Sequence, residues 1–262
     1  MNMGILEQFS LAGKVVLVTG GAGLYGRQIV EAMADAGATT WVASRNLAEL
    51  EKVASELNGR GMDVRAASLD QGDEASVMHL RDRILSECGR CDVLVNNAVL
   101  RTMKGCQSAA ETFTESMRVN ATGIFLVTRA FGDEMAKRGG GSIVNISSIQ
   151  GMVGPDATLY DGLPMNGFVP DYFFHKGGLI NFTRFTASYY GRFGVRCNCL
   201  SPGGFQTEGM HPEFVRRYGA RTFLGRLANA SDLKGAVVFL ASDASAYITG
   251  VNIPVDGGYT AK

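Results

Sequence analysis

The sequence predicts a single-domain α/β fold in which helices cover both faces of a doubly wound parallel sheet. Short apolar runs rich in β-branched residues alternate with longer amphipathic runs, as expected where a helix follows each buried strand. No stretch rich in Pro and Ser divides the chain, and a length of 262 residues suits one large domain. Repeated strand–helix units of this size therefore favour one parallel sheet.

The first half of the chain contains four predicted strands, each rich in Val, Leu or Ala. The first, 14–20 (KVVLVTG), precedes a helix at 24–37 that ends at Gly37, a residue type common at helix C-termini. Further strands are expected at 39–45, 62–68 and 91–97. Helices are expected at 47–57 and 73–88, and a third contains Asn120 and ends near Arg138.

The second half continues the alternation with three more strands. The runs SIVNISS (142–148) and GVRCNCL (194–200) are mostly apolar, and a short strand is expected at 251–255. Helices are expected at 172–193 and 232–241. We expect the segment 204–225, between the sixth strand and the last helix, to be mobile.

Composition and charge exclude several classes of protein. Because 25 Lys and Arg residues balance 25 Asp and Glu residues, the chain has no net field to attract nucleic-acid phosphates. Charged residues at 19% and hydrophobic residues at 46% are typical of a folded globular chain. The longest apolar run, 235–241, is shorter than the roughly 18 to 20 residues that cross a bilayer, and no secretory signal is evident. We expect a cytoplasmic protein without nucleic-acid or membrane partners.

The five cysteines do not predict a metal site. The ECGRC spacing of Cys88 and Cys91 suits half of a zinc site, which needs a second pair. Cys197 and Cys199 lie in an apolar run that we interpret as a buried strand. Small buried or half-buried thiols are therefore the favoured interpretation.

Four glycines, Gly20, Gly21, Gly23 and Gly26, lie between the first predicted strand and the first helix. A turn without side chains lets backbone N–H groups approach a pyrophosphate at the positive end of a helix. A glycine cluster alone is weak evidence, but this one follows the first strand of a repeating α/β pattern. The sequence therefore favours dinucleotide binding over a merely tight turn.

A second candidate site combines Ser147 and Ser148, after the fifth strand, with Tyr172 and Lys176 at the start of a helix. Side chains four residues apart share one helix face. The alternative is a surface pair, since this spacing is common by chance. An ammonium beside a phenol stabilises the phenolate, so such a tyrosine can exchange a proton with an alcohol near neutral pH.

With these positions taken together, the chain resembles the short-chain dehydrogenase/reductase family from about Leu11 to the C-terminus. The matching motifs are TGGAGLYG (19–26), NNA (96–98), Asn120 in RVNATG, SS (147–148), YFFHK (172–176), SPGG with Thr207, and VDGGYTA near the C-terminus. The resemblance implies a Rossmann fold with seven strands in the order 3-2-1-4-5-6-7. It also implies reversible hydride transfer between a nicotinamide cofactor and an alcohol or carbonyl, and a homotetramer built partly on the helix after Tyr172.

The resemblance also assigns roles to individual residues. Tyr172 matches the catalytic acid/base, and Lys176 the lysine that activates it and binds the nicotinamide ribose. Ser148 matches the serine that holds the substrate oxygen, because it stands three residues before Gly151. Asn120 matches the asparagine that holds a relay water. The expected cofactor contacts are Gly20, Gly21, Gly23, Leu24, Tyr25, Gly26, Ser44, Arg45, Asn46, Leu69, Asp70, Asn97, Ala98, Tyr172, Lys176, Pro202, Gly203 and Thr207.

The end of the second strand predicts a preference for NADP(H) over NAD(H). Members of the family that select NAD usually carry an aspartate there, which binds the adenosine ribose and repels a 2′-phosphate. Here Ser44 occupies that place and Arg45 follows it. A hydroxyl and a guanidinium both suit a phosphate. The alternative is that Arg45 points to solvent and the enzyme accepts both cofactors.

Three departures from the family pattern matter. Leu24 stands where the family has a glycine, which would displace the backbone cradle by one residue, and Val99 replaces the glycine after NNA. The segment before Tyr172 is also lengthened, within 155–170, and resembles gluconate 5-dehydrogenase-like members that act on sugars or sugar acids. We expect this insertion to form one wall of the substrate site, with a surface loop or oligomer contact as the alternative. The candidate substrate contacts are Gln150, Tyr160 and Asp161.

Several basic residues near these segments are expected mostly as surface charges, with a substrate clamp for a carboxylate or phosphate as the alternative. They are Arg101, Lys104, His211, Arg216, Arg217 and Arg221. His175 is expected to pack against a neighbour or another subunit.

The predicted function is NADP(H)-preferring interconversion of a secondary alcohol and a ketone, on a sugar, polyol or sugar-acid substrate. One alternative is a 3-oxoacyl thioester reductase. Another is a cofactor-binding regulatory protein without turnover, although such a binder would not need the Ser-Tyr-Lys-Asn set.

Overall fold

A computed structural model of the protein describes residues 4–261 and contains a seven-stranded parallel sheet in the order β3-β2-β1-β4-β5-β6-β7. The strands are β1 (Val15–Thr19), β2 (Thr39–Ser44), β3 (Val64–Ser68), β4 (Val93–Asn96), β5 (Gly141–Ile146), β6 (Val195–Pro202) and β7 (Asn252–Val255). Every residue of β1 and β4 is buried, because helices cover both faces of the sheet. The predicted fold class and strand order are confirmed.

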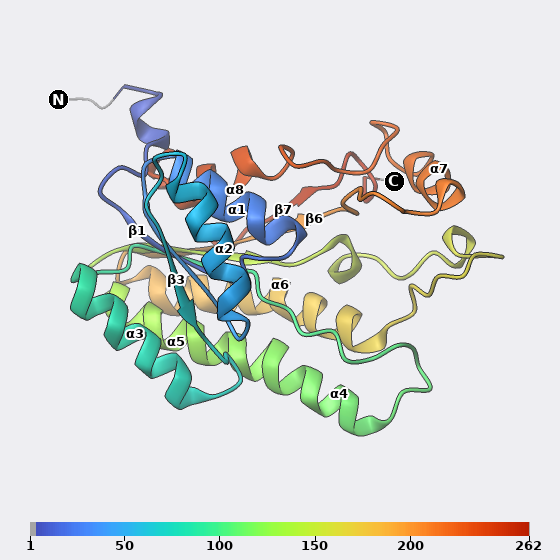
Figure 1. Cartoon of the computed structure of the whole chain (residues 1–262), viewed down its shortest axis with the longest axis horizontal. Coiled ribbons are helices and arrows are strands. Elements are labelled where there is room, and N and C mark those ends of the chain that lie inside the picture. The colour runs from blue at the N-terminus through green and yellow to red at the C-terminus, as the bar shows by residue number, and fades with distance from the viewer. Residues whose placement is uncertain (1–3, 262) are drawn as a thin grey trace.

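The helices form two layers around this sheet (Figure 1). They are α1 (Leu24–Asp35), α2 (Leu47–Asn58), α3 (Glu74–Cys88), α4 (Ala110–Met117), α5 (Ile124–Lys137), α6 (Pro170–Gly191), α7 (Pro212–Gly219) and α8 (Lys234–Ala241). One buried cluster joins one face of the sheet to α1, α2 and α8, and a second joins the other face to α3, α5 and α6. The core is therefore divided by the sheet, as in other doubly wound folds.

One helix differs from its predicted form. The helix expected to contain Asn120 is interrupted by a π-helical turn at Arg118–Gly123, between α4 and α5. Gln71 donates a side-chain hydrogen bond of 2.9 Å to the Val119 carbonyl, and a Cβ on Gly123 would lie 2.7 Å from the Gln71 carbonyl oxygen. An inserted side chain and a close backbone contact are ordinary causes of such a turn.

The segment 204–225 contains a helix that was not predicted, α7. Pro212 starts this helix, and the side chain of His211 caps it by accepting a 3.2 Å hydrogen bond from the Glu213 N–H. Its pattern is too short and too polar to stand out in the sequence. The segment therefore has regular structure in its middle.

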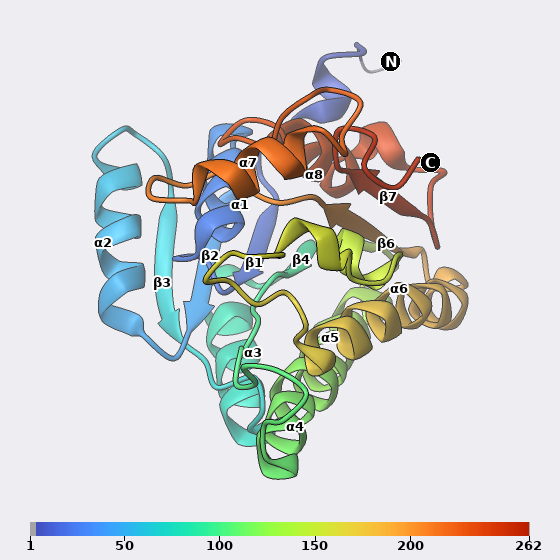
Figure 2. The same cartoon turned by 90° about the vertical axis from the view of Figure 1, so that its right-hand side faces the viewer.

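The order in which strands are added to the sheet changes side between β1 and β4. Strands β2 and β3 lie on one side of β1, and β4 to β7 lie on the other. Ligands of such sheets bind in the crevice beyond the carboxyl ends of these strands. Figure 2 looks onto this end of the molecule, where α7 and the segment that leads into α6 lie in front of the sheet. The chain segments expected to build the active site therefore gather at one edge.

All five cysteines are unpaired, and Cys91, Cys197 and Cys199 are buried. Burial raises the pKa of Cys199 to about 11. Within residues 4–261, no helix is both long and apolar enough to span a bilayer.

Candidate active site

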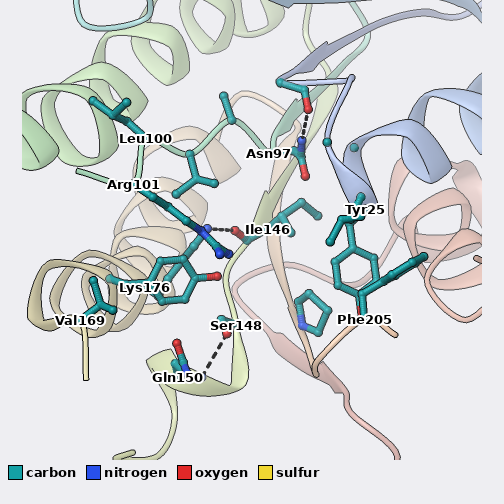
Figure 3. Close-up of a pocket in the computed structure, with 18 of the residues that line it drawn as sticks. Tyr25, Asn97, Leu100, Arg101, Ile146, Ser148, Gln150, Val169, Lys176 and Phe205 are labelled. Carbon is teal, nitrogen blue, oxygen red and sulfur yellow. Dashed lines mark hydrogen bonds between the residues drawn. The ribbon is translucent and has the colours of Figure 1, made fainter. Parts of the chain in front are cut away.

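A cavity of about 790 Å³ opens at the carboxyl ends of the strands. Its wall includes residues of the glycine-rich turn, the end of β2, and the three polar side chains Ser148, Tyr172 and Lys176. Figure 3 shows Ser148 and Lys176 on one side of the cavity, with Tyr25 and Phe205 across from them and Asn97 beyond. One cavity therefore joins the predicted nucleotide and catalytic sites.

The glycine-rich turn requires glycine at more than one position. Gly20 has a φ of +73°, and a Cβ there would lie 2.6 Å from the Ala98 Cα. A Cβ on Gly26 would lie 2.2 Å from the Gly20 carbonyl oxygen. Leu24, which replaces a family glycine, is the first residue of α1 and is 55% exposed. Since its backbone is helical, the loop accommodates this side chain at no conformational cost.

The NNA motif fastens the turn to β4. The Asn97 side-chain amide donates to the carbonyls of Thr19 (2.9 Å) and Gly20 (2.7 Å). The Thr19 hydroxyl accepts hydrogen bonds from the backbone N–H groups of Asn97 and Ala98. The turn is therefore preorganised, with the N-terminus of α1 at the cavity, and fits a pyrophosphate.

The end of β2 places Ser44 and Arg45 in the cavity wall, with Asp70 from the β3–α3 loop nearby. Asp70 accepts a 2.9 Å hydrogen bond from the Gly72 N–H, which fixes its carboxylate. Arg45 is exposed and makes no hydrogen bond or ion pair within the described chain. The pKa of Glu115 is lowered mainly by its hydrogen bond with Arg118, and the charge of Arg45 adds to this effect. This end of the cavity thus offers an available guanidinium.

At the other end, Lys176 lies beneath Tyr172. Its Nζ donates a 2.7 Å hydrogen bond to the Ile146 carbonyl and lies 5.6 Å from the Tyr172 ring centroid. Lys176 is only 3% exposed, and burial lowers its pKa although the Tyr172 phenol opposes this. A buried cation beside the phenol is the arrangement that stabilises a phenolate.

The two serines have different surroundings. Ser147 is 2% exposed, and its hydroxyl donates a 2.8 Å hydrogen bond to the Lys176 carbonyl. The Ser148 hydroxyl accepts a 3.1 Å hydrogen bond from the Gln150 N–H and keeps its own proton for another acceptor. This difference favours Ser148 as the residue that holds a substrate oxygen.

Asn120 lies behind the cavity rather than in its wall. Its side chain accepts from the Leu100 N–H (2.8 Å) and donates to the Leu100 carbonyl (2.7 Å) and the Ser116 hydroxyl (2.9 Å). Ser116 in turn donates a 2.5 Å hydrogen bond to Asp171, which directly precedes Tyr172. These bonds tie the π-helical turn to the start of α6. The relay-water role of Asn120 stays a prediction.

His175 packs edge-on against the Tyr172 ring, with 5.2 Å between ring centroids. It is 4% exposed, and neither ring nitrogen has a hydrogen-bond partner in the described structure. Burial, assisted by the charges of Lys176 and Arg101, lowers its pKa from 6.5 to about 3. The imidazole is therefore neutral at physiological pH.

Acidification is expected to destabilise the protein through His175. The unfolded chain binds a proton below pH 6.5 and the folded chain only near pH 3, so stability falls as pH falls between these values. From pH 7 to pH 5 the loss from this group is roughly 2 kcal/mol, at about 1.4 kcal/mol per pH unit. Urea unfolding of His175→Leu should show a smaller pH dependence than wild type, and equal slopes would contradict this. His79→Leu, at an exposed position, is the control.

The insertion 155–170 is fastened to α7 and the residues that follow it. The Arg217 guanidinium donates to the carbonyls of Thr158 (3.1 Å) and Asp161 (2.8 Å), and Arg221 pairs with Asp156. The Tyr160 ring lies 5.7 Å from that of Phe214, and burial raises the pKa of Tyr160. The two segments therefore form one continuous wall, and the guanidinium groups of Arg217 and Arg221 already have partners.

Most predicted contacts lie in the cavity wall, but five do not. Asn46 caps α2 with its side chain, and Gly21 faces the core, where a Cβ would lie 2.0 Å from Val42 Cγ2. Asp161 is exposed, with its carbonyl bonded to Arg217. Asn120 and Thr207 are also outside the wall, and Gln150 and Tyr160 are part of it.

The sequence interpretation missed an aromatic part of the wall. Phe205, Phe214 and Tyr218 line the cavity, and the Tyr25 hydroxyl donates a 2.9 Å hydrogen bond to the Gly203 carbonyl. The Tyr25 ring is edge-on to Phe205 at 5.1 Å. Phe214 and Tyr218 are four residues apart, and this spacing was the available signal that one apolar face of a helix packs against another part of the protein.

Comparisons with known proteins agree with this geometry. Residues 23–260 match a protein-family model described as "Enoyl-(Acyl carrier protein) reductase". The chain is 34% identical over 259 residues to D-threitol dehydrogenase of Mycolicibacterium smegmatis, covering 97% of this chain and 95% of that protein. It is 33% identical over 258 residues to galactitol 2-dehydrogenase (L-tagatose-forming) of Cereibacter sphaeroides, covering 96% and 97%.

A similar solved structure is that of a gluconate 5-dehydrogenase from Burkholderia cenocepacia in complex with NADP and tartrate. The TM-score is 0.89 at 29% sequence identity, with 99% of this chain and 100% of that chain covered. The structural match therefore covers nearly the whole length of both chains. The chain therefore belongs to the short-chain dehydrogenase/reductase family.

Proposed function

We propose that the protein is an NADP(H)-preferring oxidoreductase that interconverts a secondary alcohol and a ketone on a sugar, polyol or sugar acid. The observation that carries this proposal is the single cavity that holds both a glycine-rich helix N-terminus and Ser148, Tyr172 and Lys176. A redox cofactor and a proton-transfer group must lie side by side for hydride transfer from an alcohol.

In oxidation, the chain's own residues handle the proton. A bound nicotinamide dinucleotide supplies the hydride acceptor. Tyr172, as phenolate, takes the hydroxyl proton, while the Ser148 hydroxyl donates to the same substrate oxygen and fixes its position. Lys176 stabilises the phenolate from its buried position at 5.6 Å from the ring centroid. Asn120 positions the loop at Leu100 through both ends of its amide.

The adenosine end supports NADP(H) rather than NAD(H). Ser44 and Arg45 lie in the wall where β2 ends, and α2 begins three residues after Ser44. A hydroxyl, an available guanidinium and a helix N-terminus together suit a dianionic 2′-phosphate.

The substrate end supports a hydrophilic substrate. Gln150 and Tyr160 line the cavity and can hydrogen-bond several hydroxyls. The names of the relatives point the same way, since they act on threitol, galactitol and gluconate. A polyol or sugar-acid substrate follows from this agreement.

We also propose a homotetramer. The exposed face of α6 carries Phe174, Phe185 and Tyr189, which are 49 to 67% exposed, and the last two rings stack 6.0 Å apart. A row of exposed aromatic residues on a long helix is typical of a contact between subunits. Sedimentation equilibrium that gives the mass of a single chain would contradict this proposal.

The proposed function is tested by following nicotinamide reduction with NADP⁺ or NAD⁺ and a panel of alditols, aldonates and cyclic alcohols. We expect turnover with polyhydroxylated substrates and a lower KM for NADP⁺. Acetoacetyl thioester with NADPH is the control for the acyl-reductase alternative. Cofactor binding without turnover of any alcohol or ketone would favour a regulatory binder instead.

A further inference from the structure

Arg101 is an exposed residue of the β4–α4 loop that lines the catalytic end of the cavity. Its guanidinium carbon lies 5.0 Å from the centroid of the Tyr172 ring. In Figure 3 its side chain extends from the loop into the cavity, toward Lys176. The guanidinium is therefore beside the phenol that exchanges the substrate proton.

No acidic group neutralises this guanidinium among residues 4–261. Arg101 makes no hydrogen bond or ion pair there, and its guanidinium contacts the face of the Tyr172 ring. Asp171, a carboxylate in the same wall, is 1% exposed and accepts a hydrogen bond from Ser116 instead. The charge of Arg101 helps to lower the pKa of Lys176, after burial as the main cause. Two cations thus face the reacting end of the cavity.

The other arginines at this end have partners. Arg217 bonds to Glu213 and to two carbonyls of the insertion, and Arg221 pairs with Asp156. Lys104, in the same loop as Arg101, does not line the cavity. Arg101 is therefore the guanidinium that a negatively charged substrate would meet beside Tyr172.

We propose that Arg101 binds a carboxylate of the substrate and selects polyhydroxy acids over neutral polyols. This inference rests on the proposed function and narrows its substrate class. A planar guanidinium binds a carboxylate through two parallel hydrogen bonds, which also fixes the orientation of the substrate. Gln150 and Tyr160 line the same cavity and can hold the hydroxyls. A neutral alditol of equal length leaves the guanidinium without an anionic partner.

The test uses matched pairs of aldonate and alditol, such as gluconate and glucitol, which differ only in the carboxylate. We expect the wild-type enzyme to show a kcat/KM roughly 10- to 150-fold higher for the aldonate of its preferred pair, the range expected for a hydrogen bond between charged groups. In Arg101→Gln the ratio of kcat/KM for the aldonate to that for the alditol should fall toward one, mainly because the KM for the aldonate rises. Calorimetry should show weaker aldonate binding to the enzyme–NADPH complex.

Two further variants control the interpretation. Lys104→Gln removes a neighbouring positive charge outside the cavity wall and should keep the preference. Arg101→Lys keeps the charge without the planar fork and should restore part of the preference. An unchanged NADPH dissociation constant shows that each variant is folded.

Other outcomes would overturn the inference. Equal turnover of alditols and aldonates by the wild type would do so while leaving the proposed function intact. If Arg101→Gln lowers kcat/KM equally for the aldonate and the alditol of each pair, the guanidinium acts on the Tyr172 phenol and not on a substrate carboxylate. If no member of any pair is oxidised with either cofactor, the proposed function and this inference fail together.

Discussion

Replacing Tyr172 by Phe is expected to lower kcat by at least about a hundredfold, because proton transfer by a positioned group contributes roughly 10² to 10⁴ in rate. The Phe ring keeps the packing against His175 and the contact with Arg101. Only the hydroxyl is lost, so the dissociation constant for NADPH should stay close to that of the wild type. Steady-state kinetics and a fluorescence titration with NADPH measure the two quantities.

Lys176→Met is the companion variant. The resemblance gives this ammonium two tasks, at the phenol and at the nicotinamide ribose, so both kcat and cofactor affinity should fall. Near wild-type turnover in Tyr172→Phe would remove Tyr172 from the mechanism. An unchanged NADPH dissociation constant in Lys176→Met would contradict the second task of the lysine.

The second large effect is expected in cofactor choice. Ser44→Asp places a carboxylate where β2 ends, which would repel a 2′-phosphate and accept hydrogen bonds from the free ribose hydroxyls of NAD. Arg45→Ala removes a charged partner of the phosphate, worth roughly 1.5 to 3 kcal/mol and hence about 10- to 150-fold in selectivity. We expect Arg45→Ala to reduce the preference for NADP(H) and Ser44→Asp to reverse it.

Parallel titrations with NADPH and NADH measure this preference. Lys52→Ala is a suitable control, because Lys52 lies on α2 and pairs with Glu49 instead of lining the cavity. Wild-type protein that binds NADH as tightly as NADPH would show that the interpretation of Ser44 and Arg45 is wrong.

The sheet was predictable because strands buried on both faces leave continuous apolar runs, as in 14–20 and 194–200. The glycine-rich turn was predictable because a φ of +73° at Gly20 and a close contact at Gly26 leave little choice of residue. The adjacent serines were distinguished by their distance to Gly151, and their hydrogen bonds favour the same choice.

Long-range pairings were less predictable. The sequence shows Arg217 and Arg221 as charges in a polar segment, and only the fold reveals that Thr158, Asp161 and Asp156 lie beside them. The π-helical turn also depends on a distant residue, Gln71, whose side chain reaches the Val119 carbonyl. The helical periodicity of a segment does not reveal a partner that is distant in the sequence.

The joining of the insertion to α7 bears on how new substrate preferences could evolve in this scaffold. Residues 155–170 transplanted alone into a relative would arrive without Arg217 and Arg221, which bind Thr158, Asp161 and Asp156 in this chain. Such partners act as a unit, so their substitution effects should not add. The insertion and α7 with the residues that follow it are therefore two segments, separated in sequence, that would have to be exchanged together.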